Sequence, residues 1–60
     1  MSTYGFRAFV IGPDGHVIGR TDLHCTSEDE AKERAKQLVD GHPVELWEGP
    51  RVIERFEPQR

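Results

Sequence analysis

One stretch of this sequence has a helical period, and both of its ends carry helix-boundary residues. The stretch runs from Ser27 to Gly41 and reads S-E-D-E-A-K-E-R-A-K-Q-L-V-D-G. Ser27 is typical of an N-cap, and Glu30 can reach back to it to complete a capping box. Gly41, which precedes a proline by two residues, predicts a left-handed C′ position. A helix this short is marginal in water, so it needs a sheet to pack against.

The apolar residues of this stretch form one narrow stripe with the spacing i, i+4, i+7 and i+8. They are Ala31, Ala35, Leu38 and Val39. Because the stripe begins with two alanines, the helix can approach its partner surface closely, and that surface must supply the bulky side chains. We therefore predict that Leu38 is a core residue packed on the sheet.

The rest of the chain is typical of short strands joined by tight turns. The predicted strands are Tyr4 to Ile11, His16 to Cys25, Pro43 to Glu48 and Arg51 to Phe56. The element order is therefore ββαββ, and a right-handed crossover through the helix places the third strand beside the first. This predicts an α+β fold with a four-stranded antiparallel sheet in the order 2-1-3-4 and one helix on one face. We expect residues 1–60 to form one small domain.

The turn from Gly12 to Gly15 allows two registers for the first hairpin. A two-residue loop brings Phe6 opposite Thr21, whereas a three-residue loop with a bulge at Gly15 brings Phe6 opposite Asp22. We predict the first register because it separates polar from apolar side chains better. Its inner face consists of Tyr4, Phe6, Ala8, Val10, Val17, Leu23 and Cys25.

One helix can cover only one face of such a sheet. On the other face the chosen register leaves a set of apolar side chains, and this candidate interface consists of Phe9, Ile11, Ile18, Trp47 and Val52. An exposed apolar cluster across the middle of a sheet is typical of an interaction surface. Two alternatives are that the C-terminal segment folds over the cluster through Phe56, or that the register differs.

Charge and cysteine content argue against several classes of function. The formal net charge of -3 and the pI near 5.5 disfavour a nucleic-acid partner. No apolar run approaches the length of a membrane span, and residues 1–7 lack the pattern of a signal peptide. Cys25 is the only cysteine, which indicates a reducing, cytoplasmic location, and we interpret it as a small buried hydrophobe.

No motif for catalysis, a cofactor or a metal is present in the sequence. The single cysteine and three histidines lack the C-x-x-C or H-x-x-x-H spacing of metal sites. His24 and Cys25 are neighbours on a predicted strand, so their side chains point to opposite faces. The turn from Gly12 to Gly15 has too few glycines for a phosphate-binding loop. We therefore predict a protein that is not an enzyme and that holds no cofactor or metal.

Several segments together carry a resemblance to a known group of proteins. They are Tyr4…Phe6, Asp14-Gly15-His16, Leu23…Cys25, Glu28-Asp29-Glu30-Ala31 and Val44-Glu45-Leu46-Trp47-Glu48-Gly49. Through them the chain resembles a group of short alphaproteobacterial proteins, of which V-E-L-W-E-G is the most specific segment. No activity is known for that group. The resemblance therefore implies a self-contained bacterial domain and no site residues.

The chain is also similar to HicB-type antitoxins, which run from a hairpin to a cysteine beside a capped Glu-Ala-rich helix and then to a strand. The corresponding segments here are Cys25-Thr26-Ser27 and Glu28 to Ala35, and the P-G-C-x-x-x-G stretch of those antitoxins is absent. Our leading hypothesis is a non-enzymatic interaction module that forms a homodimer through the uncovered sheet face. The alternative is an antitoxin-like or regulatory protein that masks another protein.

Overall fold

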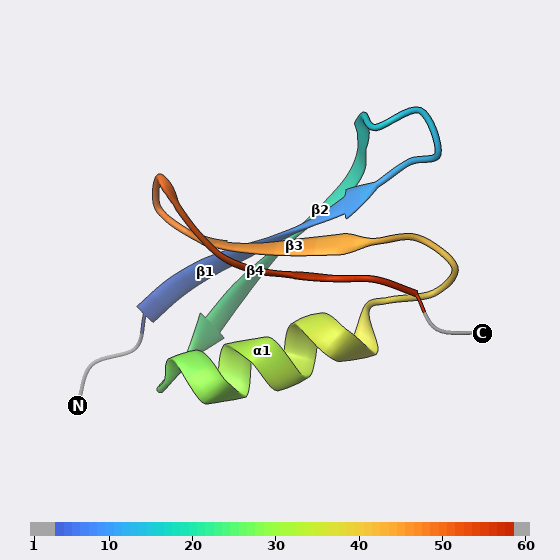
Figure 1. Cartoon of the computed structure of the whole chain (residues 1–60). Helices are drawn as coiled ribbons and strands as arrows, with labels where there is room; N and C mark the ends of the chain where they lie inside the picture. The colour runs from blue at the N-terminus through green and yellow to red at the C-terminus, as the bar shows by residue number, and fades with distance from the viewer. Residues whose placement is uncertain (1–3, 59–60) are drawn as a thin grey trace.

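The computed structural model describes residues 4–58, and its elements follow the order ββαββ (Figure 1). β1 spans Tyr4–Ile11, β2 Val17–Cys25, α1 Glu28–Gln37, β3 Val44–Glu48 and β4 Arg51–Phe56. The strands form one antiparallel sheet in the order β2-β1-β3-β4, and α1 lies along one face of it (Figure 1). The α+β class and the strand order predicted from the sequence are confirmed. Within residues 4–58, no helix is long and apolar enough to cross a membrane.

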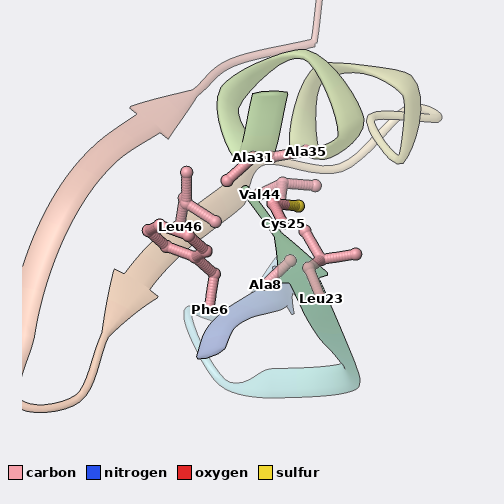
Figure 2. Close-up of a cluster of buried hydrophobic side chains, with 8 residues drawn as sticks. All are labelled: Phe6, Ala8, Leu23, Cys25, Ala31, Ala35, Val44 and Leu46. Atoms are coloured by element: carbon pink, nitrogen blue, oxygen red, sulfur yellow. The ribbon is translucent and has the colours of Figure 1, made fainter. Parts of the chain in front are cut away.

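The core lies between α1 and the face of the sheet that the helix covers (Figure 2). It consists of Phe6, Ala8, Leu23, Cys25, Ala31, Ala35, Val44 and Leu46. The helix contributes only its two alanines, both fully buried, whereas the strands contribute the bulky side chains. This confirms that small helical residues bring α1 close to a bulky sheet surface. Cys25, 1% exposed, is the buried residue that its position in the strand pattern predicts.

The end of α1 differs from the prediction. Leu38 is the C-cap, and its backbone N–H donates to the carbonyl oxygen of Ala35 at 3.0 Å. Gly41 does have a positive φ of 82°, but it lies beyond the cap, so its assignment as the C′ residue is wrong. Leu38 and Val39 pack against the margin of the core, where both are only partly buried. Leu38 is therefore a peripheral core residue rather than a central one.

The loop of the first hairpin is longer than predicted. The backbone N–H of Gly12 donates to the carbonyl oxygen of His16 at 2.7 Å, which closes a three-residue loop, and Gly15 has a φ of 88°. This is the loop of the alternative register. A second irregularity then follows, because Ile18 has no partner on β1. It shifts the pairing by one more residue, so Phe6 lies opposite Leu23 and both registers considered from the sequence are wrong.

The two irregularities have a simple consequence for the side chains of the first hairpin. Each shifts the register by one residue, so together they return most side chains to the faces predicted for them. Between the two, Val17 changes face: it was predicted on the inner face, but it pairs with Ile11 and is 55% exposed. By alternation along β1, Ile11 stays on the side of Phe9, and its predicted exposure is nevertheless wrong, because it is only 6% exposed.

The hairpin end of β1 and β2 extends away from α1 (Figure 1). On β2, Leu23 and Cys25 are buried, whereas every residue from Val17 to Asp22 is exposed or half-buried. The helix therefore covers only the C-terminal end of this strand.

Candidate interaction surface on the open sheet face

The face of the sheet opposite α1, called the open face below, carries an aromatic pair at its centre. Alternation along β1 and β3 places Phe9 and Trp47 there, diagonally across the pairing of the two strands. Their ring centroids are 6.2 Å apart and the ring planes meet at 87°, which is the edge-to-face geometry that aromatic pairs prefer. Both residues are half-buried, so part of each ring is accessible to a partner.

A carboxylate fixes the orientation of the Trp47 ring. Indole Nε1 of Trp47 donates to Oε1 of Glu45 at 3.2 Å. The other oxygen of Glu45 accepts from Nη1 of Arg55 at 3.1 Å, and Arg55 lies opposite Glu45 on β4. One carboxylate thus holds both the indole and a guanidinium. A partner that binds here meets an aromatic ring that is already held in place, which lowers the entropy cost of binding.

A second ion pair lies on the other side of the aromatic pair. Nε of Arg7 on β1 donates to Oδ1 of Asp22 on β2 at 3.0 Å, and the two residues are direct cross-strand neighbours. Both side chains are about half exposed. The open face therefore has an apolar centre with charges of both signs on either side of it.

A hollow of about 670 Å³ lies over this part of the open face. Phe9, Trp47 and Val17 give it apolar walls, and His24 contributes a polar group at its margin. The hollow is only partly enclosed, so the two rings stay accessible from solvent.

The structure brings together some of the residues of the candidate interface and separates others. Phe9 and Trp47 are in contact, and Val52, 51% exposed, lies opposite Trp47 on β4. Ile18 is 58% exposed but lies at the bulge near the hairpin end. Ile11 is buried and offers almost no surface, so its predicted exposure is wrong. Its backbone N–H donates to the carbonyl oxygen of Pro43 at 2.9 Å, so the connection from α1 to β3 runs beside it.

Sequence reasoning missed Val17, which the hairpin loop places at the open face. The three-residue loop, which the sequence also allowed, would have indicated it. In the register of that loop, Val17 lies on the same face as Phe9. Of the residues on the hairpin end, Val17 is the one that lines the same hollow as the aromatic pair.

Among residues 4–58, no group of three or more His, Cys, Asp or Glu side chains could hold a metal. Asp14 and His16 pair at 2.9 Å in the exposed hairpin loop, and the hydrogen bonds from His16 hold the pKa of Asp14 below its usual value. Burial raises the pKa of the Cys25 thiol, which keeps it in its less reactive protonated form.

The open face is therefore the candidate site, and its description rests on the contacts within this chain. No protein-family model, curated protein or solved structure matches the chain.

Proposed function

We propose that this protein is a non-enzymatic interaction module and that two copies associate through their open faces. The observation that carries the proposal is the Phe9–Trp47 pair. Two large aromatic side chains, held edge to face, are half exposed on a face that no element within residues 4–58 covers. Aromatic residues in such central positions supply a large share of the binding energy at protein interfaces.

The surroundings of the pair favour a protein partner over a small molecule. The centre is apolar, with Val17 and Val52 beside the rings, and the margin carries the Arg7–Asp22 and Glu45–Arg55 ion pairs. An apolar centre inside a polar rim is the usual anatomy of a protein interface. Arginine is also one of the residues enriched at such surfaces.

The distribution of charge favours a second copy as the partner. In a twofold interface the same surface contacts itself, so a face of one sign would repel its copy. Here each half of the face has both signs: Arg7 with Asp22 on β1–β2, and Arg55 with Glu45 on β3–β4. A twofold axis along the strands lays the β1–β2 half of one copy over the β3–β4 half of the other. Each ion pair can then meet opposite charge across the contact.

The test is the sedimenting mass at micromolar concentration. Trp47→Ala and Val52→Asp should each lower the mass of the native assembly, because one removes the central ring and the other places a charge beside it. Lys36→Asp is the matched control, since Lys36 lies on the exposed side of α1, away from the open face, and its substitution should leave the mass unchanged. Circular dichroism confirms that each variant is folded. A native protein that sediments as a monomer would refute the proposal.

The wider setting of this function stays a prediction from the sequence. We propose that the module acts in the cytoplasm, without nucleic acid, a membrane or a cofactor as partner. The acidic composition and the lone Cys25 support this setting.

A further inference from the structure

β2 forms one edge of the sheet. It pairs with β1 on one side, and no strand within residues 4–58 pairs with its other side. An open edge presents backbone N–H and C=O groups that can pair with another strand. We propose that a second copy of this chain pairs with this edge, antiparallel, with Thr21 of one copy opposite Thr21 of the other. The two sheets would then form one continuous sheet.

The charges on β2 specify this register. With a twofold axis normal to the sheet, a residue before the central one in one copy lies opposite the residue equally far after it in the other copy. With Thr21 at the centre, Arg20 of each copy lies opposite Asp22 of the other, and both side chains belong to the open face. Opposite charges in direct cross-strand positions stabilise pairing. Centring the pair on Arg20 or on Asp22 would instead set two like charges against each other.

Both charged groups are available for this contact. Arg20 is exposed, and its side chain forms no hydrogen bond or ion pair within residues 4–58. Asp22 uses Oδ1 for its contact with Arg7, and its side chain is 54% exposed, so Oδ2 can accept from an incoming guanidinium. Thr21 is also exposed, and facing threonines are a favourable cross-strand pair.

The other edge of the sheet, β4, lacks such a register. Its charges Glu54 and Arg55 are consecutive, so they point to opposite faces and cannot lie opposite each other in an isologous pair. Centring on Ile53 would bring Arg51 against Arg55, and centring on Glu54 would bring two glutamates together. The inference therefore applies to β2 alone.

The bulge at Ile18 limits the length of the pairing. Bulges often protect sheet edges because they twist the strand away from a would-be partner. Here the bulge lies near the N-terminal end of β2, and the regular stretch from Gly19 to Leu23 is centred on Thr21. The pairing we propose is confined to that stretch, in which Gly19 of one copy faces Leu23 of the other.

The edge contact is independent of the open-face contact. Pairing through β2 leaves the open faces of both copies on the same side of the extended sheet. Two such sheets can also stack through those faces. The stacking axis runs along the strands at the middle of a face and does not meet the axis at the β2 edge, so using both contacts extends the assembly rather than closing it. Each contact can therefore be tested with the other one removed.

The test of the edge uses charge exchange in a Trp47→Ala, Val52→Asp background, in which the open-face contact is disabled. The background protein should sediment as a dimer. Arg20→Asp and Asp22→Arg, each added alone, set like charges opposite each other and should weaken association by roughly tenfold or more. An equimolar mixture of the two variants should restore the dimer, because each new charge then faces its opposite. Arg51→Asp on β4 is the control and should have no effect.

Amide hydrogen exchange of the native protein gives a second measurement that needs no variant. Those amides between Gly19 and Leu23 of β2 that do not bond β1 should exchange more slowly as the protein is concentrated, while those of β4 should not change. A monomeric background protein, or a mixture that stays monomeric, would overturn the edge inference. That result would leave the open-face proposal standing if Trp47→Ala alone lowers the native mass. Conversely, an unchanged mass in Trp47→Ala would refute the open-face proposal without touching the edge.

Discussion

The carboxylate of Glu30 accepts two hydrogen bonds from Thr26, one from its backbone N–H at 3.0 Å and one from its hydroxyl at 2.9 Å. In a capping box, Glu30 would accept from the backbone N–H of the N-cap residue, Ser27. Here it accepts instead from Thr26, the residue before the N-cap. The conventional half is present, because Oγ of Ser27 accepts from the backbone N–H of Glu30 at 3.2 Å. Together these bonds join the end of β2 to the start of α1.

The first prediction concerns the energetics of this cap. Ser27→Ala should lower the free energy of unfolding by about 0.5–2 kcal/mol, because one helix N–H loses its partner. Thr26→Val and Glu30→Ala should be non-additive, since both remove the same hydrogen bonds. Ser27→Ala and Glu30→Ala should be nearly additive, since Ser27 binds the backbone of Glu30 and not its side chain. Urea denaturation of the three single and two double variants measures these effects, and the reverse pattern of additivity would contradict this geometry.

The second prediction is a pH dependence of stability. The backbone and hydroxyl hydrogen bonds from Thr26, with Arg34 nearby, hold the pKa of Glu30 below its usual value. Because the pKa is lower in the folded state, the stabilisation is present above the unfolded value and is lost as the pH falls through the folded value. In Glu30→Gln the melting temperature should therefore fall less steeply as the pH decreases below about 4.5. Glu33→Gln, on the exposed side of α1, should keep the native profile.

The third prediction separates the centre of the core from its margin. Leu46 is fully buried, whereas Leu38 is only partly buried at the end of α1. Leu46→Ala should cost roughly 2–5 kcal/mol, which is comparable to the whole stability expected for a small domain. Leu38→Ala should cost clearly less, because fewer of its contacts are lost. Equal shifts in the urea midpoint would show that Leu38 belongs to the centre.

The fourth prediction concerns Gly41 in the connection between α1 and β3. Its φ of 82° is in the left-handed region, and no atom lies within 4 Å of the place where a Cβ would be added. The cost of Gly41→Ala is therefore conformational and should be about 1–2 kcal/mol. Gly41→Asn should cost less, since asparagine tolerates this conformation better. Equal costs in thermal unfolding would show that the loop relaxes to a negative φ.

The fifth prediction uses Cys25 as a reporter. Its side chain is 1% exposed, and burial raises the pKa of the thiol, so both access and ionisation oppose its reaction. Native protein should react with an alkylating reagent far more slowly than protein in urea. The rate should increase in Leu46→Ala, which opens the same core. Equally fast labelling of native and unfolded protein would contradict the burial of Cys25.

The sequence was sufficient for the parts of the fold that depend on periodicity. The stripe of Ala31 and Ala35 identified the covered side of α1, and alternation placed Phe9 and Trp47 on the open face. These patterns repeat over a whole element, so one irregular residue does not hide them. Most of the candidate site followed from them.

The register of the first hairpin could not be read in the same way. Two single-residue irregularities, at the loop and at Ile18, each move the side chains of β2 to the other face. Over most of the strand the two effects cancel, and only the residues between them lie on a different face from the predicted one. There Val17 is exposed although it was predicted on the inner face. Gly19 beside Ile18 was the available signal, because a glycine inside a strand often accompanies a bulge. It did not indicate which residue bulges, since that depends on how the hairpin packs.

The central position of β1 has a consequence for the order of events during synthesis. β1 lies between β2, which follows it directly, and β3, which the chain reaches only after α1. Val44 and Leu46 of β3 are fully buried, so the hairpin and the helix lack the middle of their core until β3 is in place. Bringing β3 to β1 requires closing a long loop, which is slow relative to local contacts. A nascent chain that ends before Val44 should therefore stay unfolded at the ribosome, and folding should proceed in one cooperative step once β3 and β4 have emerged.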